Sequence, residues 1–201
     1  MIRKSISLIL LCALALVIAI PRPAAAGRSA RAGYDWAATL YYGVLTEATL
    51  GEMSRFDVEF DTDFTYLALA LTRKITEVGP HLNLEGEGII VKYMEGQDHL
   101  ELDALVALRW LSFPWNRHLD TTVAAGLGLS YATELPPYEV RNKGESEKFL
   151  SFLLFELTAG IPKIPQWDLV MRVNHRSGAF GLFDGMKGAM NSLAFGLKFR
   201  F

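Results

Sequence analysis

The sequence has almost no cysteine. Cys12 is the only one among 201 residues, and it lies inside an apolar N-terminal run. The chain beyond that run therefore contains no disulfide and no cysteine-based metal site. Leu11 is bulky and the apolar run continues past Cys12, which argues against a lipoprotein signal.

The chain also lacks an excess of positive charge. The first 26 residues carry three positive charges and no acids, so removing them takes the formal net charge from −2 to −5. A mildly acidic domain without a basic patch does not favour binding to nucleic acid. We therefore expect no nucleic-acid partner.

A long apolar run is missing after the N-terminus, although 51% of the residues are hydrophobic. This composition is compatible with two classes of protein. One is a secreted, soluble β domain such as a lipocalin-like binder. The other is an outer-membrane barrel, whose apolar residues are spread over many alternating strands.

The N-terminus has the pattern of a secretory signal peptide. Two positive residues precede an apolar run at residues 7–20, which is short for a membrane span. Ala24-Ala25-Ala26 fits a cleavage site, and Ala30-Arg31-Ala32 is a second candidate. Two prolines directly after the run argue against an uncleaved anchor. We expect a signal peptide over residues 1–26 and one domain over residues 27–201.

Apolar residues alternate with small or polar ones in a series of segments that are each about ten residues long. In His99–Trp110, for example, Leu100, Leu102 and the following even positions face one way, and the acids face the other. In 81–94 the pattern is less regular, and we expect a bulge near Gly86 or Gly88. The segments are 36–46, 64–73, 81–94, 99–110, 121–131, 149–161, 167–177 and 191–201.

These features predict an all-β fold, an eight-stranded antiparallel transmembrane β-barrel. The even strand number, the strand length and the alternation of long loops with short turns are typical of that class. Closure also leaves no unpaired strand edge in the bilayer. The long polar loops 47–63 and 134–148 are expected outside the cell, and both termini in the periplasm. The tryptophans then form an interfacial girdle: Trp36, Trp110, Trp115 and Trp167.

The second face of each strand carries small residues and charges. These side chains suit the narrow interior of an eight-stranded barrel and leave no pore. We interpret the acids and arginines on this face as one internal ion-pair network rather than as a metal site. Its expected members are Glu85, Glu87, Glu101, Asp103, Arg109, Glu156 and Arg172.

A candidate catalytic site lies in the C-terminal hairpin. His175 and Ser177 sit at the outer end of an apolar strand face, and Asn191 starts the same face of the next strand. Ser177 has the chemistry of a nucleophile, His175 that of its base, and Asn191 can orient the imidazole. The backbone N–H of Gly178 is a candidate oxyanion donor. The alternative is that these polar side chains simply lie at the membrane interface.

The stretch NHRSGAFGLFDGMKGAMNSLAFGLKFRF, residues 174–201, resembles the C-terminal end of the lipid A 3-O-deacylase (PagL-like) outer-membrane family. The resemblance implies location in a Gram-negative outer membrane, lipid A or lipopolysaccharide as partner, and hydrolysis of an acyl ester without cofactor or metal. It assigns Ser177 as nucleophile and His175 as base. The family has an acid where this chain has Asn191, and often Asn where it has Gly178. Asp184 is an alternative acid.

A second interpretation is a small barrel without catalytic activity. Such a protein is structural or adhesive and acts through the loops 47–63 and 134–148, or it is a family member that has lost activity. The sequence does not decide between these functions, and it does not decide whether the barrel forms a homodimer.

Overall fold

The structure is a computed structural model that describes residues 27–55, 57–179 and 189–201. The expected signal peptide and the alternative acid Asp184 lie outside these residues. Both stay predictions.

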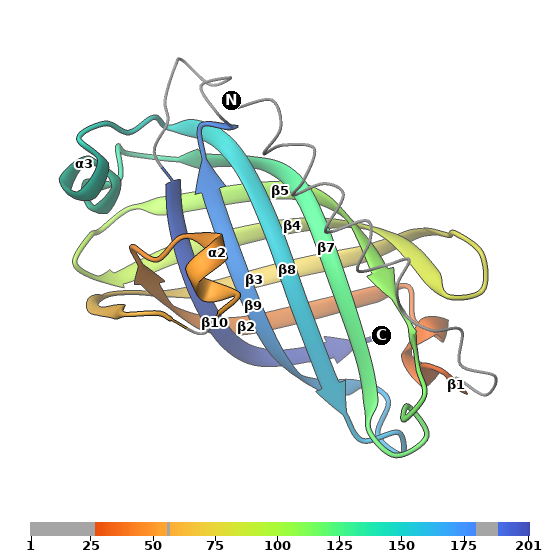
Figure 1. Cartoon of the computed structure of the whole chain (residues 1–201). Helices are drawn as coiled ribbons and strands as arrows, with labels where there is room; N and C mark the ends of the chain where they lie inside the picture. The colour runs from red at the N-terminus through yellow and green to blue at the C-terminus, as the bar shows by residue number, and fades with distance from the viewer. Residues whose placement is uncertain (1–26, 56, 180–188) are drawn as a thin grey trace, which may run out of the picture.

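Eight long strands form a closed antiparallel barrel (Figure 1). Its order is β10-β2-β3-β4-β5-β7-β8-β9, so the last strand closes the barrel against the first long one. This confirms the predicted fold class. The strands are β2 (Trp36–Thr46), β3 (Phe60–Glu77), β4 (Leu82–Glu95), β5 (Leu100–Trp110), β7 (Asp120–Ala132), β8 (Phe149–Gly160), β9 (Trp167–Ser177) and β10 (Ala189–Arg200).

Short elements occupy several of the connections that the sequence left as loops. The connection after β2 contains a helix, and β3 begins several residues earlier than expected. The connection between β7 and β8 also contains a helix. No helix among the described residues is long and apolar enough to cross a membrane. The short elements are β1 (Gly27–Arg28), η1 (Ala30–Gly33), α2 (Leu50–Met53), β6 (Ser112–Phe113) and α3 (Pro137–Lys143).

The barrel wall has an apolar outer face and a polar inner face. On β5, the leucines are exposed while Glu101 and Asp103 are buried. Leu169 on β9 and Leu127 on β7 leave 67% and 60% of their surface exposed. Soluble proteins rarely expose such a continuous apolar belt, whereas a transmembrane barrel presents it to lipid.

The two ends of the barrel differ. Trp36 and Phe201 exchange backbone hydrogen bonds of 3.1 and 2.9 Å, so both ends of the strand series meet at what we call the terminal end. The opposite, loop end carries α2 and α3 (Figure 1). All four tryptophans of the chain lie at or beside strand ends of the terminal end, as a girdle requires.

The predicted position of a bulge in β4, near Gly86 or Gly88, is wrong. β4 pairs continuously with β5 across both glycines. Where β3 pairs with β4, one register shift leaves Ile75 of β3 unpaired and the other leaves Met94 of β4 unpaired. The inner face of β4 changes from acids to Ile89 and Val91 because the interior changes from ion pairs to an aromatic cluster. The irregular sequence pattern of residues 81–94 therefore reflects a change in what the inner face of β4 contacts, from ion pairs to aromatic side chains.

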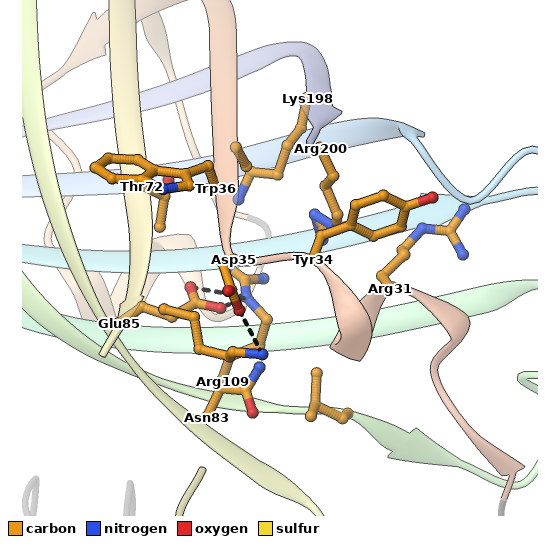
Figure 2. A pocket seen from close by; sticks show the side chains of 13 residues that line it. Arg31, Tyr34, Asp35, Trp36, Thr72, Asn83, Glu85, Arg109, Lys198 and Arg200 are labelled. Carbon is orange, nitrogen blue, oxygen red and sulfur yellow. Dashed lines mark hydrogen bonds and ion pairs between the residues drawn. The ribbon is translucent and has the colours of Figure 1, made fainter. Parts of the chain in front are cut away.

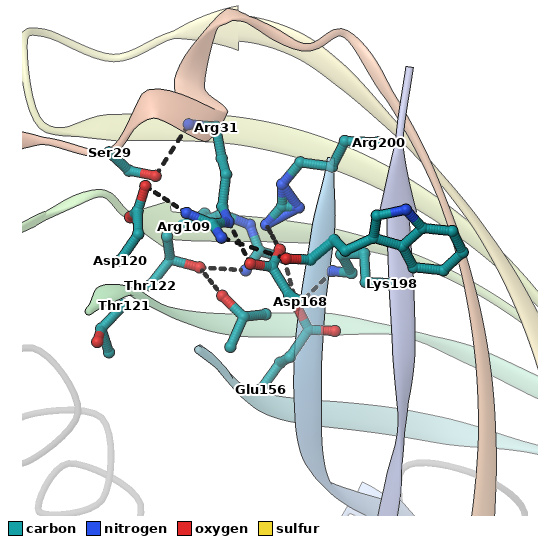
Figure 3. A network of polar contacts seen from close by, with 12 residues as sticks. Ser29, Arg31, Arg109, Asp120, Thr121, Thr122, Glu156, Asp168, Lys198 and Arg200 are labelled. Carbon is teal, nitrogen blue, oxygen red and sulfur yellow. Dashed lines mark hydrogen bonds and ion pairs between the residues drawn. The ribbon is translucent and has the colours of Figure 1, made fainter. Parts of the chain in front are cut away.

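Glu156 is the centre of an ion-pair network in the terminal half of the interior (Figure 3). It accepts hydrogen bonds from Arg109 Nη2 and Arg172 Nε, each at 2.7 Å, and from Lys198. The two arginines also bind Glu85 and Glu87 respectively, both at 2.8 Å.

The expected network is thus confirmed for five of its members, but its extent was wrong. Glu101 and Asp103 lie toward the loop end and make no ion pair with Arg109 or Arg172 in the described chain.

The N-terminal segment closes the terminal end of the barrel. Arg31, in η1, is 3% exposed and forms ion pairs with Asp120 on β7 and Asp168 on β9. A Cβ at Gly160 would lie 2.1 Å from Arg31 Nη2, so glycine provides the space for the guanidinium. Figure 2 shows Arg31 with the other side chains that line a cavity of about 20 Å³ at this end.

Replacing Arg31 by alanine is expected to lower the free energy of unfolding by about 3 kcal/mol, because two buried carboxylates then lose their shared cation. Urea unfolding of the refolded barrel in detergent measures this change. Arg117→Ala, at an exposed arginine of the same end, is the matched control. Adding Asp120→Asn to Arg31→Ala should restore part of the loss, because Asp120 pairs with Arg31 among the described ion pairs, whereas Asp168 also pairs with Arg200.

An unchanged unfolding midpoint for Arg31→Ala would contradict the role of the ion pairs.

The second candidate cleavage site, Ala30-Arg31-Ala32, would remove Arg31 and its ion pairs from the mature chain. We therefore expect the mature chain to begin at Gly27, which N-terminal sequencing checks.

Candidate active site

A cluster of outward-facing polar side chains interrupts the apolar belt near the loop end of β8, β9 and β10. It consists of His175, Ser177, Asn191 and Ser151, and we call it the outward polar cluster. Arg172, Asn174 and Arg176 of β9 point to the interior, so the alternating His175 and Ser177 point outward. The register places Asn191 directly opposite His175, and Ser151 directly opposite Ser177.

His175 and Asn191 are joined by a hydrogen bond of 2.7 Å between Nδ1 and Oδ1. The amide nitrogen of Asn191 donates to the carbonyl oxygen of Ala48, also at 2.7 Å. Since a carbonyl can only accept, this second bond fixes the amide orientation and leaves Oδ1 to accept from His175. Nδ1 therefore carries the proton, and Nε2 keeps the lone pair that a general base needs.

Asn191 is more enclosed than the sequence predicted. It belongs to the outward face by parity, yet it is only 4% exposed. Ala48, in the connection after β2, accepts a hydrogen bond from its side chain and so holds that connection beside it. The predicted lipid-facing position of Asn191 is therefore wrong in this respect: the side chain lies between the wall and the segment around Ala48.

The Ala48 carbonyl is held in place by its own neighbours. Ala48 N donates to Thr46 Oγ1 at 3.1 Å, which ties the residue to the end of β2. Thr49 and Glu52 form a capping box at the start of α2, with hydrogen bonds of 3.2 and 2.7 Å. Local capping on both sides of Ala48 thus positions the acceptor for Asn191.

Ser177 is turned toward β8. Its Oγ lies 3.2 Å from Ser151 Oγ, and Ser151 donates its own proton to the Ser177 carbonyl at 2.7 Å. The Ser177 hydroxyl is therefore the donor of the pair. No hydrogen bond links Ser177 with His175 in the described part of the chain. Rotation about the Cα–Cβ bond of Ser177 redirects the hydroxyl to another staggered position.

Ser151 was not among the site residues predicted from the sequence. Its signal was a hydroxyl on the face of β8 that otherwise carries Leu153 and Phe155. The role of Ser151 becomes clear only from the register of β8 against β9, because that register places Ser151 opposite Ser177.

Gly178, the candidate oxyanion donor, has a clear position. Gly178 is buried and follows directly after β9, and Ala179 has a left-handed backbone with φ of 45°. The role of the Gly178 N–H as oxyanion donor stays a prediction. Glu156 points to the interior and belongs to the ion-pair network, so it is not the acid partner of His175.

The outward polar cluster has the residues for acyl transfer: a hydroxyl, an imidazole with a fixed tautomer, and an amide that orients it. Among the described residues, no group of three or more histidine, cysteine or acidic side chains is placed to hold a metal ion.

No protein-family model and no curated protein sequence matches the chain. The solved structure of the outer membrane enzyme PagL is similar, with a TM-score of 0.55 and 12% identity over 82% of this chain and 99% of that one. OprG of Pseudomonas aeruginosa matches with a TM-score of 0.41 and 12% identity over 87% and 97% of the two chains. Ail of Yersinia pestis matches with 0.39 and 11% over 84% and 99%. At these identities the likeness shows the fold, that of outer-membrane eight-stranded barrels.

Proposed function

We propose that the protein is an outer-membrane serine esterase that hydrolyses an acyl ester of lipid A. One observation carries the proposal: the Ala48–Asn191–His175 chain of hydrogen bonds fixes the base form of an imidazole two residues from Ser177. The resemblance of residues 174–201 to the lipid A 3-O-deacylase family and the barrel fold shared with an outer membrane enzyme support it.

The position of the outward polar cluster suits a lipid substrate. It faces outward beside Val173 and Leu193, which lie opposite each other on β9 and β10. With the termini in the periplasm, the loop end lies in the outer leaflet, where lipid A is found in Gram-negative bacteria. The acyl chains then lie against the apolar belt, and the ester lies at the depth of the polar cluster.

The chemistry begins with rotation of Ser177 from Ser151 toward His175. Nε2 takes the serine proton as Oγ attacks the ester carbonyl carbon, and the Gly178 N–H stabilises the oxyanion. The imidazolium then protonates the departing sugar hydroxyl, which leaves an acyl-serine. Water, deprotonated by His175, hydrolyses this intermediate and regenerates the serine.

Catalysis is expected to be slow. The amide of Asn191 holds the correct tautomer, but it does not neutralise the imidazolium as a carboxylate does. In a serine protease, exchanging the triad acid for an amide lowers the rate by about 10⁴, largely because the wrong tautomer results. Here the Ala48 carbonyl prevents the wrong tautomer, so we expect a smaller loss.

The test compares the mass of lipid A from Gram-negative cells that produce the wild type, Ser177→Ala or Ser54→Ala. Wild type and Ser54→Ala, a control at an exposed serine of the loop end, are expected to give lipid A that lacks one acyl chain. Ser177→Ala is expected to leave it intact. Heat-modifiable migration on gels confirms that each barrel is folded. Unchanged lipid A with folded wild type, across several acylation patterns, would exclude this activity.

The orientation of Ser177 favours one alternative, a barrel without catalytic activity. Its hydroxyl is engaged with Ser151, and the loop end carries ordered elements, with Arg141 of α3 bonded to Asp61 of β3 at 2.5 Å. A structural or adhesive barrel predicts that deletion of residues 137–143 changes cell attachment while Ser177→Ala changes nothing.

A further inference from the structure

Arg176 lies between His175 and Ser177 on β9, and its side chain, 1% exposed, points to the barrel interior. Its three nitrogens donate five hydrogen bonds, as many as a guanidinium has N–H groups. A side chain that is bonded in so many directions has little freedom left, and it restrains the backbone that carries it. Arg176 therefore anchors the part of β9 that carries two residues of the outward polar cluster.

Four of these five hydrogen bonds go to the connection between β7 and β8. Two reach the carboxylate of Glu139 in α3, at 2.6 and 2.7 Å. Two reach the backbone carbonyls of Glu147 and Lys148, at 2.6 and 2.9 Å. The fifth joins Arg176 Nε to the hydroxyl of Ser130 on β7, at 3.0 Å. The end of β9 is thus held from the inside by the segment that leads from β7 into β8.

The carboxylate of Glu139 is itself held in place. Glu139 is 1% exposed and accepts a further hydrogen bond from Ser146 Oγ at 2.6 Å. The neighbouring Tyr138 is buried as well, and its ring lies 4.8 Å from that of Phe64 between centroids. These contacts hold α3 against the loop end of the barrel, so that its carboxylate meets the guanidinium.

The same connection also bears on the outer side of β9. It leads into β8, whose Ser151 lies opposite Ser177 and accepts its hydroxyl proton. For catalysis this hydroxyl has to turn to His175, and the position of the β9 backbone sets how closely the two groups meet. A misplacement of about 1 Å can lower the rate of an enzyme about 100-fold. The geometry of the cluster therefore depends on where the connection holds β9.

We propose that Arg176 is a positioning residue of the outward polar cluster. Its ion pair with Glu139 holds the end of β9 where the Ser177 hydroxyl can turn to His175. This role rests on the proposed esterase function, and it adds α3 to the parts of the chain that act on the site. A second acid, Glu101 of β5, lies 3.6 Å from Arg176 Nε and keeps the guanidinium paired when Glu139 loses its charge.

Arg172 supplies a matched comparison on the same strand. It also points to the interior, and it pairs with Glu87 at 2.8 Å and with a second acid, Glu156. Its neighbours along the chain are Met171 and Val173, which belong to the apolar outer face. Glu87→Gln therefore removes an equivalent buried charge from β9 at a place with no reactive residue beside it.

The test compares Glu139→Gln with Glu87→Gln in the refolded barrel in detergent. Single-turnover deacylation over a range of lipid A concentrations separates the rate at saturation from the half-saturating concentration. For Glu139→Gln we expect the rate at saturation to fall about 10–100-fold. The half-saturating concentration should stay unchanged, because the reacting groups are misplaced while the substrate still binds. Glu87→Gln is expected to keep the wild-type rate, although both variants should lower the urea unfolding midpoint.

A fluorophosphonate probe gives a second measurement that needs no lipid A. Ser177 Oγ attacks the phosphorus, fluoride leaves, and His175 takes the serine proton, so the rate of labelling depends on the same geometry. Glu139→Gln is expected to slow labelling by a similar factor. If this variant does not fold, Arg176→Lys and Arg172→Lys serve the same comparison, because lysine keeps the charge but lacks the planar fork of donors.

Equal turnover in Glu139→Gln and Glu87→Gln, whether unchanged or reduced, would overturn the positioning role and leave Arg176 with a purely structural one. A folded wild type that neither deacylates lipid A nor reacts with the probe would overturn the proposed function, and the positioning role with it.

Discussion

Replacing Glu156 by leucine is expected to prevent stable folding of the barrel. Glu156 accepts hydrogen bonds from three buried cations, Arg109, Arg172 and Lys198. Breaking a single buried ion pair costs about 3–5 kcal/mol, because the remaining charge stays buried without its partner. With three cations affected, the loss approaches the entire stability of a typical domain, about 5–15 kcal/mol.

Urea unfolding followed by heat-modifiable migration measures this effect. The exposed Glu134→Leu is the control, with an expected change within about 0.5 kcal/mol. Glu156→Gln keeps the shape of the side chain but not its charge, so it should lie between the two. An unfolding midpoint of Glu156→Leu equal to that of the wild type would show that the network does not stabilise the barrel.

The fold follows closely from the sequence because lipid and interior place opposite demands on alternate residues. This is why β5 and β9 were predicted almost to the residue. The limits of β3 were missed: its first and last residues, near Phe60 and Glu77, extend beyond the apolar belt. There most residues are polar, apart from Phe60 and Ile75, so a strict alternation of apolar and polar residues no longer marks the strand.

The site was only partly predictable for a different reason. Parity and the hairpin were enough to make His175 and Asn191 neighbours. The Ala48 carbonyl comes from a segment more than a hundred residues away in sequence, and Ser151 depends on the register of β8. Similarly, the anchoring of Arg31 by Asp120 and Asp168 exists only once the barrel has closed.

Among residues that do not react themselves, Asn191 is where the largest effect on activity is expected, after loss of Ser177 or His175. In Asn191→Leu, no acceptor holds the Nδ1 proton of His175, so the imidazole is free to adopt the wrong tautomer and orientation. We expect the rate of ester hydrolysis to fall by about 10³–10⁴. Single-turnover deacylation of lipid A in detergent measures it. Asn142→Leu, at an asparagine of α3 outside the outward polar cluster, is the control.

Asn191→Asp distinguishes the two partners of the amide. An aspartate still accepts from His175 and also neutralises the imidazolium, so we expect activity at or above that of the wild type. Its second oxygen, however, meets the Ala48 carbonyl where the amide donated at 2.7 Å. Repulsion between these oxygens should release the segment 47–59, which limited proteolysis at the loop end detects.

If Asn191→Leu kept the wild-type rate, Asn191 would have no part in orienting His175. If Asn191→Asp left the segment 47–59 as resistant as before, the Ala48 contact would not hold it. An amide serves both neighbours at once, because it offers an acceptor to the imidazole N–H and a donor to a backbone carbonyl. An aspartate cannot meet both demands, because it has no hydrogen to donate to the Ala48 carbonyl.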